Sequence, residues 1–130
     1  MDADEHKSDD LFREESYKLI RFFMKLLNAI GNGFYEKIYE NGLVVDQKKN
    51  PVPYDQQANY PIHYEGVEIG RFIPDLIAFN QIIVDTKTIH QITDREKGQM
   101  LNYLKVTGLN LGLIINFKHA KLEFERIVRS

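Results

Sequence analysis

The sequence predicts a single α/β domain whose elements follow the order α-α-β-β-β-α-β, with room for one more strand at the C-terminus. Three observations predict this class. Apolar residues recur every three or four positions over residues 11–30, apolar and polar residues alternate over 52–65, and residues 82–84 are apolar on both faces of an extended segment. The length of 130 residues fits one domain of ordinary size.

Two helices are expected at the start of the domain. The first is strongly amphipathic over residues 11–30, and the glycines within residues 31–33 end it. The second covers about residues 34–48 and stops before Asn50-Pro51, because a proline disfavours helical geometry in the residue before it. Residues 1–10 show no apolar period, so we expect a flexible acidic arm there and a domain that begins at residue 11.

Three strands are expected in the middle of the chain. The alternation over residues 52–65 predicts a half-buried strand, and two prolines within it favour an edge position. A turn at Glu65-Gly66 leads into a second strand over about residues 67–79, and Asn80-Gln81 turns the chain again. The third strand, which opens with residues 82–84, should be central and covered by helices on both sides because both of its faces are apolar.

A third helix and the closing extended segments complete the domain. Thr93 and Glu96 have the spacing of a capping box, in which each side chain satisfies an otherwise unpaired backbone N–H at the start of a helix. This helix should end at Thr107-Gly108. Residues 111–117 and 122–128 then supply two further extended segments.

Composition excludes several kinds of site. The chain has no cysteine, which excludes disulfides, thiolate zinc sites and cysteine nucleophiles, and favours a hard cation if a metal is bound. The apolar stretch at residues 109–117 is too short to span a bilayer, and the acidic N-terminus lacks the features of a secretory signal. We therefore expect a cytoplasmic protein that neither spans nor binds a membrane.

Charge is distributed unevenly along the chain. The net charge is −2 overall, but residues 1–15 carry seven acidic side chains against two basic ones. Residues 97–130 carry six lysines and arginines against two glutamates. This basic C-terminal quarter points weakly to a polyanionic partner, and an ordinary solvated surface is the alternative interpretation.

Two aspartates and a lysine stand out as candidates for chemistry. Asp85 and Lys87 are two residues apart on the third predicted strand, so their side chains project to the same face. The turn at residues 80–81 folds Asp75 back alongside them. A strict two-residue hairpin would place Asp75 opposite Thr86, on the wrong face, so we expect a three-residue connection or a bulge that aligns Asp75 with Asp85 and Lys87.

Neighbouring carboxylates repel each other unless a cation lies between them. A divalent metal converts this repulsion into a binding site, and Mg²⁺ suits a set of carboxylate ligands. Lys87 beside such a metal could orient or deprotonate a water molecule, or stabilise negative charge on a transferring phosphoryl group. The alternative interpretation of Asp85 and Lys87 is an ordinary ion pair at the end of a strand.

Four patterns together resemble a known family over about residues 19–128. Pro74-Asp75, nine further residues and then Asp85-Thr86-Lys87 resemble the signature of the PD-(D/E)xK nuclease superfamily. Residues 33–39 match the pattern that names one branch, the GxxExxY proteins. Gln99 and Tyr103 resemble the QxxxY element of RecB-like nucleases, and residues 112–117 are similar to the closing strand of the GxxExxY branch.

The resemblance implies a restriction-endonuclease-like core, in which a mixed β-sheet flanked by helices carries an Mg²⁺-dependent phosphodiesterase site that Mn²⁺ could also serve. It implies that Asp75 and Asp85 are the principal metal ligands and that the carbonyl of Thr86 is a further ligand. Glu36, from the second helix, would be an acid close to the metal. Lys87 would be the catalytic lysine.

The resemblance also implies roles for residues outside the central strands. Gln99 would steady the catalytic lysine or a phosphate, and Tyr103, one turn later on the same side of its helix, would contact substrate. For Glu36 and Gln99 the alternative is a solvated polar group on a helix, and for Tyr103 it is packing. Lys105 and Lys118, in the basic quarter, are expected to contact the phosphate backbone.

The expected function is therefore that of a Mg²⁺-dependent nuclease that hydrolyses phosphodiester bonds, with DNA as the expected substrate. The alternative is a catalytically weak or inactive module that keeps the nuclease fold and binds nucleic acid or a protein partner. The chain is small and has little spare surface for reading bases, which makes a homodimer or a larger complex plausible. Glu40, one turn after Glu36, is expected to lie on the same side but farther from the metal, so that Glu40→Gln changes little.

Overall fold

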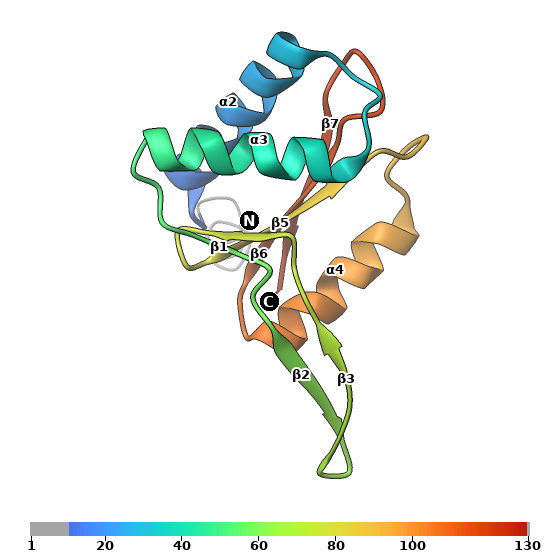
Figure 1. Ribbon diagram of the computed structural model, residues 1–130. Coiled ribbons are helices and arrows are strands. Elements are labelled where there is room, and N and C mark those ends of the chain that lie inside the picture. Colours follow the sequence, from blue (N-terminus) through green and yellow to red (C-terminus); the bar gives the residue numbers. More distant parts are fainter. Residues whose placement is uncertain (1–10, 130) are drawn as a thin grey trace, which may run out of the picture.

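The computed structural model describes residues 11–129 and arranges them as a sheet with helices on both faces (Figure 1). Helices α2 and α3 pack on one face of the sheet and α4 on the other. The helices span Arg13–Ile30 (α2), Glu36–Lys49 (α3) and Asp94–Thr107 (α4). The acidic arm expected over residues 1–10 lies outside the described residues.

The central sheet has five strands in the order β1-β4-β5-β6-β7. β5 and β6 pair in parallel, and the other neighbouring strands pair antiparallel. Parallel neighbours need a long crossover connection, which α4 provides between β5 and β6. The strands span Tyr54–Gln56 (β1), Leu76–Ala78 (β4), Ile82–Lys87 (β5), Leu111–Asn116 (β6) and Glu123–Val128 (β7). The predicted α/β class, with helices flanking the sheet and a central third strand, is confirmed.

A separate two-stranded hairpin, β2 (Tyr60–Tyr64) with β3 (Val67–Phe72), extends away from the sheet (Figure 1). Tyr64 pairs with Val67, so the connection is the predicted two-residue turn at Glu65-Gly66. Both turn residues have left-handed φ values, 50° and 78°, which is the geometry that tight hairpins favour. β3 is exposed along most of its length and becomes half-buried only at Phe72.

The two strands predicted over residues 52–65 and 67–79 are each divided in the structure. The first breaks at Gln57, whose φ of 64° turns the chain out of the sheet, so β1 pairs with β4 at the sheet edge while β2 joins the hairpin. The second breaks over residues 73–75 between β3 and β4. The expected order α-α-β-β-β-α-β is therefore wrong in its strand count. Alternation over residues 52–65 continues across Gln57 and does not report the first break. The second break coincides with Pro74, directly before Asp75.

Two buried clusters hold the layers together. The larger one lies between the sheet and α2 and α3, and the smaller one, which includes Met100 and Leu104 of α4, lies on the opposite face. Successive residues of β5 alternate between them, since Ile82 and Val84 join the larger cluster and Ile83 joins the smaller one. Asp85 and Lys87 continue the series of Ile83 and therefore belong to the face that carries α4.

The starts and ends of the helices agree with the sequence signals. Thr93 and Glu96 form both hydrogen bonds of the capping box at the start of α4. Gly108 ends that helix with a left-handed φ of 77°.

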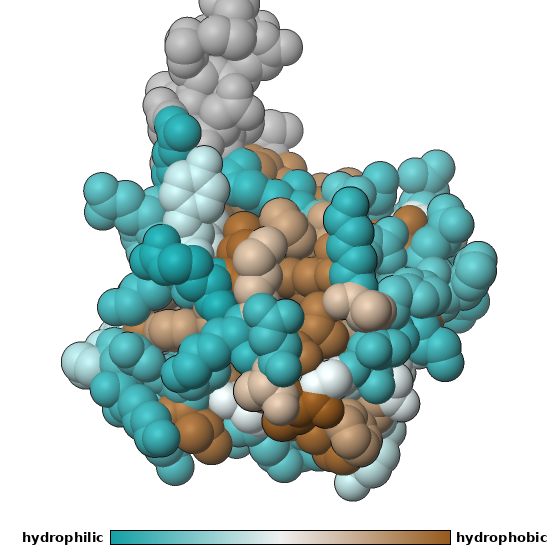
Figure 2. Space-filling view, turned by 90° about the horizontal axis from the view of Figure 1, so that it is seen from above, coloured by the Kyte–Doolittle hydropathy of each residue, from teal (hydrophilic) through white to brown (hydrophobic). Residues whose placement is uncertain are grey.

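Figure 2 shows the end of the molecule at which α2 and α3 lie. This surface is mostly hydrophilic, and apolar side chains gather near its middle. Within residues 11–129, no helix combines the length and apolarity needed to cross a membrane.

Candidate active site

The connection between β4 and β5 sets the position of Asp75. Ala78 pairs with Ile82, so the loop consists of three residues, 79–81, as the sequence analysis required. Two of these three residues have left-handed φ values of 56° and 59°. Asp75 stands one position before the Leu76↔Val84 pair, and this register brings it alongside Asp85. The side chains of both aspartates line the same pocket.

Asp75 is also held by the backbone of β5. Its Oδ2 accepts hydrogen bonds from the backbone N–H and the hydroxyl of Thr86, each at 3.0 Å. Because the N–H and C=O groups of a strand residue point to the same side, the carbonyl of Thr86 is directed toward the side on which Asp75 lies. Thr86 itself is fully buried. The carboxylate of Asp75 and the carbonyl of Thr86 are therefore fixed relative to each other.

Asp85 and Lys87 form an ion pair in which the Lys87 Nζ lies 3.5 Å from the Asp85 Oδ2. The two side chains are only 18% and 21% exposed, respectively. Burial raises the pKa of Asp85 to about 7, opposed by the charge of Lys87 and reinforced by the charge of Asp75. Burial alone would lower the pKa of Lys87, but the charges of Asp85 and Glu36 outweigh it and leave that pKa raised. The pair thus combines a partly protonated acid with a firmly protonated amine.

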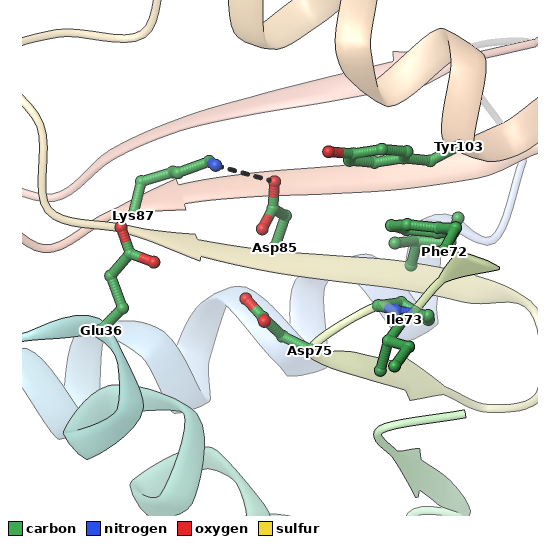
Figure 3. Close-up of a pocket in the computed structure, with 9 residues that line it drawn as sticks. Glu36, Phe72, Ile73, Asp75, Asp85, Lys87 and Tyr103 are labelled. Atoms are coloured by element: carbon green, nitrogen blue, oxygen red, sulfur yellow. Dashed lines mark ion pairs between the residues drawn. The ribbon is translucent and has the colours of Figure 1, made fainter. Parts of the chain in front are cut away.

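Glu36 reaches this pocket from α3, a helix that packs on the sheet face opposite to α4. It is the first residue of α3, and its carboxylate faces the space that Asp75 and Asp85 also border (Figure 3). The pocket has a volume of about 180 Å³, and the exposed residues of its lining are Glu36 and Ile73. Lys87 lies across this space with its amine directed at Asp85 (Figure 3). Four charged groups from three separate elements therefore meet at one opening.

Tyr103 reaches the same pocket from α4. Its ring stacks on that of Phe72, with 3.9 Å between ring centroids and 12° between ring planes. Its hydroxyl points toward Asp85 (Figure 3). Burial, together with the charge of Asp85, raises the pKa of the Tyr103 hydroxyl, so this group remains a hydrogen-bond donor at neutral pH.

The segment that leaves the hairpin contributes to the pocket in a way that was not predicted from the sequence. Phe72, Ile73 and Pro74 line the pocket immediately before Asp75. An aromatic residue three positions before a candidate ligand was the available signal, but these residues were expected only to continue the second predicted strand. The hairpin base is therefore part of the pocket wall, although the hairpin itself points away from the sheet.

The remaining candidates lie outside the pocket lining. Gln99 is half-buried on α4, one turn before Tyr103, and is not among the residues that border the pocket. Lys105 is exposed near the end of the same helix, and Lys118 is exposed in the loop after β6. The roles assigned to these three residues stay predictions.

Glu40 was expected to be a residue whose replacement by glutamine changes little, but its surroundings in the structure argue against this. It is 3% exposed, and its carboxylate pairs with Lys37 at 2.6 Å and accepts hydrogen bonds from the amides of Gln56 and Gln57. It therefore links α3 to the last residue of β1 and to the residue that follows it. Glu40→Gln would disturb this buried network, so it cannot serve as a neutral comparison for Glu36→Gln.

Comparison with known proteins adds to this geometry. The sequence model of the PD-(D/E)XK nuclease superfamily matches residues 13–127. The chain belongs to this superfamily. Among solved structures, it is similar to the crystal structure of SSO0001, with a TM-score of 0.59 and 17% sequence identity, over 91% of this chain and 59% of that one. The chain thus spans under two thirds of SSO0001, and the likeness concerns the fold alone. No curated protein matches.

The PD-(D/E)XK residues supply an appropriate set of donors for Mg²⁺. Within residues 11–129, no group of three or more His, Cys, Asp and Glu side chains is gathered closely enough to hold a metal ion. Mg²⁺ does not need such a group, because it commonly uses one or two carboxylates and keeps several waters. Asp75, Asp85 and the Thr86 carbonyl provide two carboxylates and one carbonyl oxygen. Glu36 lines the same pocket, and its link to a metal stays a prediction.

The two hydrogen bonds that Asp75 accepts from Thr86 should stabilise this PD-(D/E)XK fold, and this is our first prediction. Asp75→Ala should lower the free energy of unfolding by about 1–3 kcal/mol, because the buried N–H and hydroxyl of Thr86 lose their acceptor. Asp75→Asn should lose less, because its amide oxygen can still accept and the repulsion from Asp85 is relieved. Urea unfolding in EDTA measures both. Equal destabilisation by the two variants would contradict the hydrogen-bonding role of the carboxylate.

Proposed function

We propose that the protein is a Mg²⁺-dependent nuclease that hydrolyses phosphodiester bonds in DNA. The observation that carries the proposal is the meeting of Asp75, Asp85 and Lys87 in one pocket, with Glu36 at its opening. Membership of the PD-(D/E)XK nuclease superfamily supports the same reaction class. Asp75 also serves the fold through its hydrogen bonds with Thr86, but Asp85, whose pKa burial raises, lies beside a second carboxylate and a lysine in one pocket, and such clusters are typical of functional sites.

Each group in the pocket has a role that its position supports. Asp75, Asp85 and the Thr86 carbonyl would hold Mg²⁺, which supplies Lewis-acid stabilisation of the charge that develops on the phosphate. Lys87, protonated, would donate hydrogen bonds to the attacking water or to a phosphate oxygen. The water oxygen would bond to phosphorus as it gives up a proton to solvent, the ester P–O bond would break, and the departing oxygen would take up a proton from solvent, which leaves a phosphate monoester and a hydroxyl group. The Tyr103 hydroxyl can donate to an oxygen of the same phosphate.

We further place the chain in the GxxExxY branch, and the geometry of residues 33–39 supports this. Gly33 has a φ of 92°, a conformation that side-chain-bearing residues rarely adopt. Glu36 lines the pocket, and Tyr39 is fully buried with its hydroxyl bonded to the loop before Glu36. The three positions of the pattern therefore have three distinct physical tasks: turning the chain, presenting an acid and anchoring the loop.

The proposal is tested by metal binding and by cleavage of defined substrates. Single-stranded, double-stranded and branched DNA, together with RNA, are incubated with the protein in Mg²⁺, Mn²⁺ or EDTA. We expect cleavage of DNA that requires the metal. Absence of both cleavage and Mg²⁺ or Mn²⁺ binding at millimolar concentration would instead favour a binding module that keeps the nuclease fold.

A second prediction concerns Glu36. Glu36→Gln should weaken metal-dependent cleavage by about tenfold or more, the usual effect of losing an acid that orients the surroundings of a metal site. Glu14→Gln is the matched control, because Glu14 is also an exposed acid in the first turn of a helix and lies outside the pocket. Initial cleavage rates at saturating Mg²⁺ compare the two. If both variants behave like the wild type, Glu36 has no part in the reaction.

A further inference from the structure

Tyr35 is an exposed aromatic residue directly beside the proposed nuclease site. Its side chain is 69% exposed, and it immediately precedes Glu36 at the pocket opening. Phe34, the residue before it, is 46% exposed. The Phe34 ring lies 6.3 Å from that of Tyr39, whereas the more exposed Tyr35 side chain gains little from burial, so its contribution to the fold is small. Since Tyr35 directly precedes a residue of the pocket, an exposed ring at this position favours a role in binding.

The loop that carries Tyr35 is held firmly in place by Tyr39. The Tyr39 hydroxyl accepts a hydrogen bond from the Phe34 N–H at 3.1 Å and donates one to the Gly31 carbonyl at 2.8 Å. The Tyr39 ring stacks on Phe117, with centroids 4.2 Å apart and planes within 4°. The backbone on both sides of Tyr35 is therefore anchored to the core, and a ring presented by a fixed backbone loses little freedom on binding.

A basic loop runs beside this aromatic one. The amide of Asn32 donates to the Lys118 carbonyl at 2.9 Å, and the Gly33 N–H donates to the Phe117 carbonyl at 3.1 Å. Figure 1 shows the α2–α3 connection and the β6–β7 connection side by side. Residues 118–121 are all exposed and include two lysines and a histidine, and neither loop contains an acid. A loop with two exposed aromatic residues and an exposed basic loop therefore lie side by side, and the first of them leads directly into Glu36 of the pocket.

We propose that the loops at residues 31–35 and 118–121 form a subsite for a single-stranded segment of nucleic acid that leads away from the catalytic pocket. A base would stack on Tyr35, and phosphates would lie near Lys118 and Lys121. A single strand is favoured over a duplex because an exposed ring can stack only on a base whose face is free. This inference rests on the proposed function and extends it to a substrate class.

The absence of tryptophan from the chain allows a direct test. Tyr35→Trp introduces a single tryptophan at the subsite, and Tyr64→Trp introduces one at a tyrosine of similar exposure, 66%, on the distant hairpin. An oligothymidylate is titrated into each variant in EDTA, which prevents metal-dependent cleavage. We expect stacking to quench the fluorescence of Tyr35→Trp and to leave that of Tyr64→Trp unchanged. Equal responses from both variants would overturn the proposal.

Affinities measured in the same buffer complete the test. Tyr35→Ala should weaken binding of single-stranded DNA by about tenfold or more, Tyr35→Phe should restore it, and Tyr64→Ala should have no effect. Lys118→Gln should reduce the slope of log affinity against log salt by about 0.7. Unchanged binding by Tyr35→Ala, or an equal loss for duplex DNA, would overturn the subsite.

The subsite and the nuclease function fail in different ways. Tyr35-dependent binding of single strands by a protein that cleaves nothing in any metal would reject the proposed function and keep the subsite. Cleavage by a protein whose single-strand binding ignores Tyr35 would reject the subsite alone.

Discussion

Asp85→Asn and Lys87→Met should each lower Mg²⁺-dependent cleavage by about 10²–10⁴-fold, the range typical of losing a group that acts on the reacting atoms. Both side chains line the pocket, and neither joins the buried apolar clusters, so the fold should survive both changes. Single-turnover cleavage rates measure the loss, and thermal unfolding confirms that each variant is folded.

Asp55→Asn is the control for these two variants. Asp55 is an exposed aspartate on β1, at the edge of the same sheet, and it does not line the pocket. This variant should cleave at the wild-type rate. Wild-type rates in folded Asp85→Asn or Lys87→Met would mean that the Asp85–Lys87 pair is only an ion pair at the end of a strand.

The pH dependence of stability should reveal the buried acid. Because burial raises the pKa of Asp85 from 3.8 to about 7, the folded protein binds one more proton than the unfolded chain between these two values. The contribution of Asp85 to stability is therefore full below about pH 4 and is lost as pH rises through 7. In EDTA, the free energy of unfolding should fall by a few kcal/mol across this window because of Asp85.

Asp85→Asn isolates this contribution, because asparagine does not titrate. Urea unfolding at pH 5 and pH 8 should show a smaller decline for Asp85→Asn than for the wild type, and the variant should be the more stable of the two at pH 8. Parallel pH profiles for the two proteins would show that Asp85 titrates in its ordinary range. Adding Mg²⁺ at pH 8 should stabilise the wild type and not the variant.

The pairing of Asp75 with Asp85 could be predicted from the sequence, because a shared metal site requires a strand register that places both side chains on one face of the sheet. Both carboxylates must share a face, and a three-residue connection or a bulge allows this, whereas a two-residue hairpin does not. The structure confirms that connection. The ends of α4 were equally predictable, since the capping box and Gly108 act locally. Features that depend on a few neighbouring residues or on one register are therefore within reach of sequence analysis.

Features set by distant contacts were not predictable in the same way. The break at Gln57 depends on that residue adopting a left-handed φ, and alternation on either side conceals it. The burial of Glu40 depends on Gln56 and Gln57, which approach only after the chain has turned. The stack of Phe72 on Tyr103 joins the hairpin to α4 across 31 positions of sequence, a pairing that no local pattern encodes. Tertiary contacts decide all three.

The most direct test of the central claim is a cleavage time course with end-labelled DNA. Wild-type protein is incubated with single-stranded and duplex DNA in Mg²⁺ and in EDTA, beside Asp85→Asn purified identically. Our account predicts that products accumulate with the wild type in Mg²⁺, that EDTA prevents this, and that Asp85→Asn falls to background. Cleavage by Asp85→Asn at the wild-type rate, or no cleavage by the wild type with any divalent metal, would contradict it.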